Sequence, residues 1–169
     1  MTNCERAIEN LKHKEKFIAI DNDDIIYYGI SKKKWPNWEG WQYVEKKKYE
    51  EATSLVKDFY ENNIWIPLGC NKIINFSVTF NCFQAATKRT VKDVIIDMQR
   101  TCNVFDKNIA LTGIINSSTI RAINSIDEDA FNKVFSAFQL CYFINNAESI
   151  GNEKLRKWII DQFSLENIE

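Results

Sequence analysis

The sequence predicts one mainly α-helical domain with a small β hairpin near its N-terminus. Apolar residues recur at helical spacing over most of the 169 residues, whereas β-prone runs are confined to about residues 17–28. The hydrophobic content of 45% and the aromatic content of 13% exclude a disordered composition. A chain of this length can bury one sizeable core, so we expect a single domain over residues 1–169.

The first helix is predicted to begin at Thr2 or Asn3, because either side chain can accept hydrogen bonds from the first free backbone N–H groups. Ala7, Ile8 and Leu11 follow at helical spacing and form one apolar face. We expect this helix to end at the lysine-rich segment that follows.

Two β-prone runs, residues 17–20 and 25–28, flank an acidic turn at residues 21–24 and predict a hairpin. Three aspartates in this turn could suggest a calcium site. Their spacing does not match a calcium loop, and the closing glutamate is missing, so we expect a solvated turn. Ser31 is expected to cap a short helix through Trp35.

Further helices are predicted along the rest of the chain from the same periodicity. They run from about Tyr43 to Asn62, Lys72 to Lys88, Val91 to Cys102, Ser118 to Ile126, Asp127 to Cys141 and Asn152 to Phe163. The second of these is apolar on nearly every face, so we expect it to be the central buried helix.

Composition excludes several functions. The net charge of −1 argues against a nucleic-acid binder that depends on bulk charge, and the lysine clusters at 32–34 and 46–48 are expected to be solvated. The five cysteines are dispersed without a CxxC pair, and His13 is the single histidine, so no metal site, Cys/His pair or cofactor is predicted. No signal peptide and no membrane span are predicted, which favours the cytoplasm.

Aromatic residues are dense between the hairpin and the next helix, at Trp35, Trp38, Trp41 and Tyr43. An indole ring can stack on the apolar C–H face of a sugar, so these rings could form a sugar-binding wall. They could equally cover the core from a loop. The sequence leaves both interpretations open.

Several short motifs occur in order along the chain. They are Tyr28-Gly29-Ile30-Ser31 followed by Trp35-Pro36, Ile64-Trp65-Ile66-Pro67-Leu68, residues 83–90 followed by Met98-Gln99, residues 112–120, and Lys157-Trp158. Together they resemble the muramidases of glycoside hydrolase family 108, which are lysozyme-like endolysins of phages and bacteria with a C-terminal peptidoglycan-binding segment. The resemblance covers about residues 11–163.

The resemblance implies a lysozyme-like helical domain with its hairpin at residues 17–28. Residues 1–100 would form the lysozyme-like part, and residues 101–169 the peptidoglycan-binding-like helical part. It also implies a set of substrate-binding residues, namely Tyr28, Trp35, Trp65, Gln84, Lys88 and Gln99.

The catalytic motif of that family is altered here. Its Glu-Gly-Gly-Tyr motif falls on Lys14-Glu15-Lys16-Phe17, so the catalytic glutamate position is Lys14 and both glycines are replaced. Glycoside hydrolysis needs a protonated carboxyl group, usually beside a second carboxylate. A shift of one residue would instead make Glu15 the acid, with one of the hairpin aspartates (Asp21, Asp23 or Asp24) as the second carboxylate.

We therefore expect a degenerate, catalytically inactive muramidase-like protein that binds peptidoglycan glycan strands or a protein partner. It would belong to a phage-derived or secretion-associated cell-wall system, with a holin, phage or secretion machinery delivering it to the periplasm. One alternative is an active N-acetylmuramidase with Glu15 as general acid. Another is a protein-interaction or structural module on the same scaffold.

Overall fold

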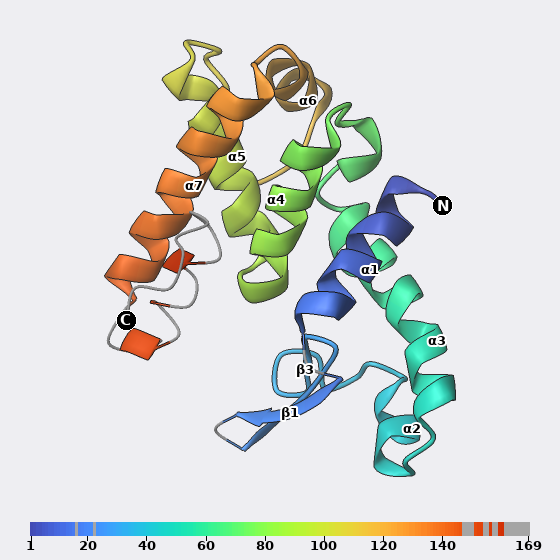
Figure 1. Cartoon of the computed structure of the whole chain (residues 1–169). Coiled ribbons are helices and arrows are strands. Elements are labelled where there is room, and N and C mark those ends of the chain that lie inside the picture. Colours follow the sequence, from blue (N-terminus) through green and yellow to red (C-terminus); the bar gives the residue numbers. More distant parts are fainter. Residues whose placement is uncertain (16, 22, 147–150, 154–155, 157–158, 161–169) are drawn as a thin grey trace.

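Helices form most of the chain, and one small antiparallel sheet lies near the N-terminus (Figure 1). The structure is a computed structural model. It describes residues 1–169 except 16, 22, 147–150, 154–155, 157–158 and 161–169. The predicted fold class, mainly α with a small N-terminal β element, is confirmed.

The first helix, α1 (Asn3–Lys14), begins as the sequence predicts. Thr2 Oγ1 accepts a hydrogen bond from the Glu5 N–H at 3.2 Å, and the Glu5 carboxylate accepts one from the Thr2 N–H at 2.8 Å. This reciprocal pair satisfies two backbone donors that would otherwise have no partner at the helix start. Ala7, Ile8 and Leu11 are buried, so the predicted apolar face is confirmed.

The sheet has three strands in the order β1-β2-β3: β1 (Ile18–Asp21), β2 (Asp24–Tyr27) and β3 (Ile30–Ser31). The predicted hairpin is β1–β2, whose register pairs Ile18 with Tyr27. The expected short helix from Ser31 is wrong, because Tyr28 (φ 46°) and Gly29 (φ 82°) turn the chain back so that β3 pairs with β2.

The single helix expected over residues 43–62 is also wrong. It is divided into α2 (Trp41–Glu45), α3 (Tyr49–Tyr60) and a π-helical turn η1 (Glu61–Trp65). Lys47 lies between α2 and α3 with a φ of 57°, a left-handed conformation that a continuing helix cannot contain. The break lets α2 pack against α3.

The remaining described helices follow the predicted order, but the helix expected from Lys72 begins only at Phe76, because Ile73 and Asn75 are extended. They are η2 (Cys70–Lys72), α4 (Phe76–Lys88), α5 (Val91–Val104), α6 (Ser117–Asn124) and α7 (Glu128–Asn145). Each of the four α-helices has an N-cap residue whose side chain accepts hydrogen bonds from backbone N–H groups of the first turn. These residues are Asn75, Thr90, Asn116 and Asp127. The helix expected at about residues 152–163, with the Lys157-Trp158 motif, lies largely outside the described residues.

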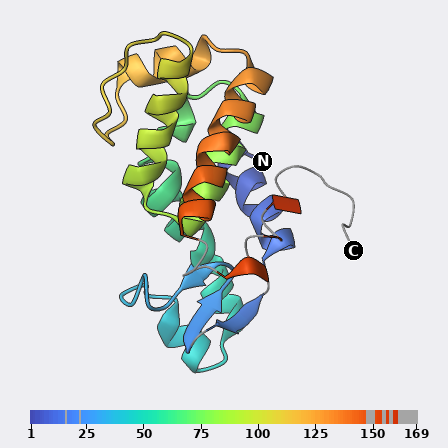
Figure 2. The same cartoon turned by 90° about the vertical axis from the view of Figure 1, so that its left-hand side faces the viewer.

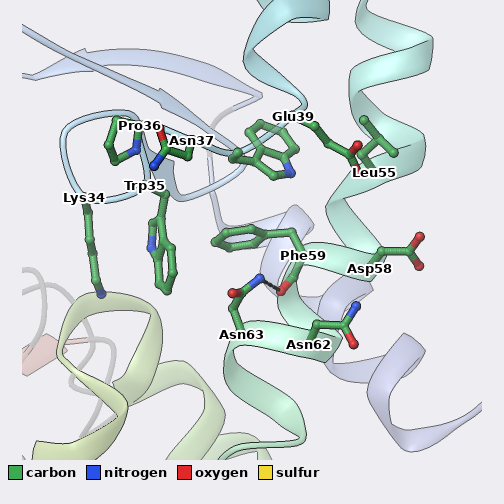
Figure 3. Close-up of a pocket in the computed structure, with 11 residues that line it drawn as sticks. Lys34, Trp35, Pro36, Asn37, Glu39, Leu55, Asp58, Phe59, Asn62 and Asn63 are labelled. Atoms are coloured by element: carbon green, nitrogen blue, oxygen red, sulfur yellow. Dashed lines mark hydrogen bonds between the residues drawn. The ribbon is translucent and has the colours of Figure 1, made fainter.

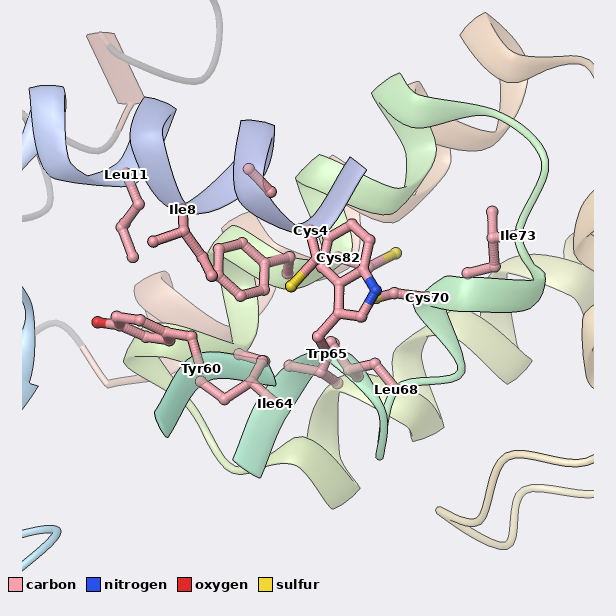
Figure 4. Packing of buried hydrophobic residues seen from close by; sticks show 14 of the residues in the cluster. Cys4, Ile8, Leu11, Tyr60, Ile64, Trp65, Leu68, Cys70, Ile73 and Cys82 are labelled. Carbon is pink, nitrogen blue, oxygen red and sulfur yellow. The ribbon is translucent and has the colours of Figure 1, made fainter. Parts of the chain in front are cut away.

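Helix α4 lies at the centre, in contact with α1, η1, α5 and α7 (Figure 1). Figure 4 shows the part of the core where α1, η1 and α4 meet, with Cys4, Cys70 and Cys82 around the Trp65 ring. One continuous cluster of buried apolar residues extends from Cys4 to Phe135. Helix α5 crosses residue 100 within this cluster, and the division into parts 1–100 and 101–169 stays a prediction.

A buried polar cluster joins α5 and α7 beneath the end of α4. The Arg89 guanidinium donates to Asp97 Oδ2 at 2.6 Å and to Gln139 Oε1 at 2.7 Å, and it lies 4.0 Å from the centre of the Tyr142 ring. Asp97 also accepts from Arg100 at 3.0 Å. Because buried charges are costly unless paired, this cluster ties α7 to the α4–α5 connection.

Within the part of the chain that the structure describes, none of the helices combines the length and the apolarity needed to cross a lipid bilayer.

Candidate functional site

Glu15 lies directly after α1, where the helix meets the sheet. Its backbone N–H donates to the Leu11 carbonyl at 2.9 Å, and its side chain is half-buried against Gly29. A Cβ atom on Gly29 would lie 3.4 Å from Glu15 Cγ and 2.9 Å from the Tyr60 hydroxyl. Glu15, Gly29 and Tyr60 therefore meet at one point, and the space between them is too small for a larger residue at position 29.

The buried Tyr60 hydroxyl anchors this junction. It donates to the Tyr28 carbonyl at 2.8 Å and so holds the turn between β2 and β3 against α3. Burial raises the pKa of Tyr60 far above its ordinary value, and the negative charge of Glu15 raises it as well. Tyr60 therefore keeps its proton as a donor and does not act as an acid or a base near neutral pH.

Tyr28 is the predicted substrate-binding residue that lies beside Glu15 in this arrangement. Its ring is half-buried, contacts Phe17 edge to face at 5.3 Å, and has the Lys12 ammonium 5.7 Å from its centre. The left-handed backbone of Tyr28 and Gly29 directs the chain past the end of α1. The Tyr-Gly dipeptide thus forms the sheet side of the junction.

The hairpin carboxylates lie at the other end of the sheet from Glu15. Asp21 pairs with Asp24, three residues along the strands from the Ile18–Tyr27 pair, which corresponds to about 10 Å of strand. Asp24 also has a structural role, because it accepts hydrogen bonds from the Ser31 hydroxyl and, at 2.9 Å, from the backbone N–H of Lys33. The Asp24 carboxylate thus anchors the loop after β3.

A cavity of about 570 Å³ opens between that loop and the α3–η1 segment (Figure 3). One wall consists of residues 34–39. The other comes from α3 and η1 and contains Leu55, Asp58, Phe59, Asn62 and Asn63. Glu15 is not among the lining residues, so this aromatic cavity is a second candidate site, separate from the α1–sheet junction.

Two of the clustered tryptophans line the aromatic cavity, and a third supports them. Trp35 meets the Phe59 ring edge to face at 5.1 Å, and Trp38 approaches the same ring at 5.8 Å. Trp41 is buried and donates from Nε1 to the Trp35 carbonyl at 2.7 Å. Trp35 and Trp38 therefore line a cavity and Trp41 packs in the core, while the sugar-binding wall stays a prediction.

Other predicted substrate-binding residues lie elsewhere. Trp65 is buried against Phe83, and the fully buried Gln99 donates to and accepts from the loop at residues 112–114. Both stabilise the fold in this structure. On α4, Gln84 is half-buried and Lys88 is exposed.

Four cysteines are buried and Cys141 is exposed. Burial raises the pKa of Cys4 and of Cys102 to about 11. These thiols are therefore protonated and unreactive near neutral pH. Among the described residues, no group of three or more histidine, cysteine, aspartate or glutamate side chains is arranged to hold a metal ion.

The arrangement of helices around α4, with a small sheet at the end of α1, is that of a lysozyme-like fold. A solved structure with the same fold is that of SagA from Brucella abortus, which superimposes with a TM-score of 0.71. The two chains are 14% identical, and the match covers 95% of this chain and 94% of SagA. Neither a protein-family model nor a curated protein sequence matches this chain. The likeness supports the lysozyme-like fold, and membership of glycoside hydrolase family 108 stays a prediction.

Proposed function

We propose that this chain is a peptidoglycan-related, lysozyme-like protein that holds glycan strands at the α1–sheet junction and hydrolyses them poorly or not at all. The observation that carries the proposal is the position of Glu15. Its carboxyl group lies at the junction, whereas Asp21 and Asp24 pair at the far end of the β1–β2 hairpin, about 10 Å of strand beyond the Ile18–Tyr27 pair, and Asp24 is engaged in holding a loop. The lysozyme-like fold shared with SagA supports the choice of ligand class.

The chemistry of glycoside cleavage explains why this arrangement favours binding. One carboxyl group must protonate the leaving oxygen, and a second carboxylate usually stabilises the cationic transition state or activates water. Pairs that work together are about 5–5.5 Å apart in retaining enzymes and about 6.5–9.5 Å apart in inverting enzymes. Glu15 caps the end of α1 before β1 begins, whereas Asp21 is the last residue of that four-residue strand, so this arrangement favours neither geometry.

Tyr28 beside Glu15 and the exposed Lys88 remain our candidates for contacts with the glycan. Lys88 offers a cation to the carboxylate groups of peptide stems, and Tyr28 offers a ring face to a sugar.

An active muramidase with Glu15 as general acid is the second candidate. The observation that favours it is the close approach of Glu15 Cγ to Gly29, which leaves the carboxyl group half-buried at the end of α1. A general acid must be held in a fixed position within reach of the leaving oxygen, and a carboxyl group packed against Gly29 has such a position.

Two assays on the same protein test these proposals. Purified protein is mixed with insoluble peptidoglycan and sedimented, and its lysis of chloroform-treated Gram-negative cells is followed by turbidity. The variants are Glu15→Gln and, as a matched control, Glu9→Gln, which changes an exposed glutamate on the same helix.

We expect wild type and both variants to sediment with peptidoglycan without lysing cells. Lysis by wild type and Glu9→Gln that is abolished in Glu15→Gln would establish the muramidase and overturn the binding proposal. Absence of both sedimentation and lysis would overturn both proposals and favour a protein-interaction module.

A further inference from the structure

The aromatic cavity combines ring faces with polar groups in a volume suited to a small molecule. Its volume of about 570 Å³ lies within the range of about 300–1,000 Å³ that small-molecule sites occupy. Phe59 is 6% exposed and forms the floor, whereas Trp35 and Trp38 are half-buried and retain accessible ring surface. Flat apolar walls of this kind match the C–H face of a pyranose ring.

Amide and carboxylate groups surround the rings on both sides. Figure 3 shows Asn62 and Asn63 on one side of Phe59 and Glu39 on the other. Asn63 Nδ2 donates to the Phe59 carbonyl at 2.8 Å, which fixes the amide and leaves its Oδ1 atom to accept from a ligand. Asn62 is exposed at the rim. Such groups can bind several hydroxyl groups around one sugar ring.

The charges of the lining favour a neutral ligand. Lys34 extends along Trp35, with its ammonium 5.8 Å from the ring centre and 3.0 Å from the Arg89 carbonyl, to which it donates (Figure 3). A second cation on Trp35 would be repelled by Lys34. An anion would meet Glu39 and Asp58, which also line the cavity. A polyhydroxylated neutral ring avoids both penalties.

The loop that carries Trp35 is held in place from several directions. Asp24 binds the Ser31 hydroxyl and the Lys33 N–H, and the Trp35 N–H donates to the Ser31 carbonyl at 2.9 Å. Trp41 donates to the Trp35 carbonyl at 2.7 Å. A site whose walls are ordered before binding loses less entropy when a ligand enters.

We infer that the aromatic cavity is a saccharide-binding site for one neutral pyranose ring, physically separate from the α1–sheet junction. The inference rests on the proposed function for the choice of sugar, since the glycan strands of peptidoglycan consist of N-acetylated hexosamines. The site would hold one sugar of a strand independently of Glu15.

The experiment is a titration of the protein with the N-acetylglucosamine trimer, followed through the indole N–H signals in ¹H–¹⁵N NMR spectra. We expect the signals of Trp35 and Trp38 to shift and that of the buried Trp65 to stay. The double variant Asp58→Ala/Asn62→Ala removes two rim groups and should weaken binding about tenfold. Glu51→Gln, an exposed change on α3 outside the cavity, should bind as wild type does.

Unchanged Trp35 and Trp38 signals at saturating trimer, or equal affinity in the double variant, would overturn the inference. If the same signals shift with tetramethylammonium and not with the trimer, the inference is wrong and the cavity binds a cation. The two proposals fail differently. Trimer binding without sedimentation on peptidoglycan would contradict the proposed function alone, whereas sedimentation unaffected by the double variant, with unmoved Trp signals, would contradict this inference alone.

Discussion

Replacing Gly29 by alanine tests whether the α1–sheet junction is as tightly built as the structure shows. Gly29 has a φ of 82°, and a left-handed backbone costs a residue with a Cβ atom about 1–2 kcal/mol. The new Cβ would also lie 2.9 Å from the Tyr60 hydroxyl, an overlap that we expect to cost about 1–2 kcal/mol more. The total is about 2–4 kcal/mol, which lowers the Tm of a domain of this size by roughly 10 °C.

Two comparisons separate these contributions. Gly151 has a similar φ of 86°, and a Cβ atom there would have no described atom within 4 Å, so Gly151→Ala should show the backbone cost without the overlap. Tyr60→Phe removes the hydroxyl and its hydrogen bond to Tyr28, at a cost of about 1 kcal/mol. In that background, Gly29→Ala should cost about 1–2 kcal/mol less than in wild type.

The assay is urea unfolding of wild type, the two single variants and the double variant, with Gly151→Ala beside them, followed by circular dichroism at constant pH. The reasoning is refuted if Gly29→Ala costs no more than Gly151→Ala. It is also refuted if the cost of Gly29→Ala is the same with and without the Tyr60 hydroxyl.

Three further predictions concern the rest of the fold. Asp97→Ala should lower the free energy of unfolding by about 3–5 kcal/mol, because it leaves a buried guanidinium without its carboxylate, whereas Arg100→Ala removes a half-exposed partner and should cost less than about 1 kcal/mol. The hydrogen bond from Lys57, with that from the Thr2 backbone, lowers the pKa of Glu5 from 4.5 to about 2, so its contribution to stability is present above about pH 4.5 and is lost as the pH falls towards 2. Glu5→Gln should therefore flatten the dependence of unfolding free energy on pH in that interval. With an aromatic disulfide reagent, Cys141 should be the one fast thiol of the native protein, and all five should react in urea.

Each of these predictions has a contrary outcome. Equal costs for the Asp97 and Arg100 variants would show that the buried pair is solvated. A pH dependence unchanged in Glu5→Gln would assign the acid sensitivity to other carboxylates. Fast reaction of a second thiol at neutral pH would show that a core cysteine is accessible.

Much of the helical pattern was predictable, because helix starts depend on local chemistry. The side chains of Thr2 and Asp127 accept hydrogen bonds from backbone N–H groups two or three residues later, and a contact over so short a distance can be predicted from the local sequence. The break at Lys47 and the third strand at Ile30 were not predictable in the same way. Both depend on left-handed residues other than glycine, at Lys47 and Tyr28, a conformation that these residue types do not indicate. At Tyr28 the turn is also held by the Tyr60 hydroxyl, 32 residues along the chain.

The candidate sites were predicted in part. Glu15 and Trp35 were singled out by residue type and order along the chain, but the same approach also selected Trp65 and Gln99, which the structure buries. Periodicity and motif order indicate which residues share a helix face. They do not indicate whether that face meets solvent or another helix. Phe59 was expected only as an apolar face residue, and no local signal marked it as the floor of a cavity.

The sequence by itself determined the helical class, the position of the hairpin and the caps of most helices, since these follow from the spacing of apolar residues and from contacts within a few residues. The tertiary structure alone decided that Glu15 meets Gly29 and Tyr60, and that the Trp35 loop encloses a cavity against Phe59. These groups are 14 to 45 residues apart along the chain. Their meeting depends on how α1, the sheet and α3 pack together, and no local preference encodes such a long-range arrangement.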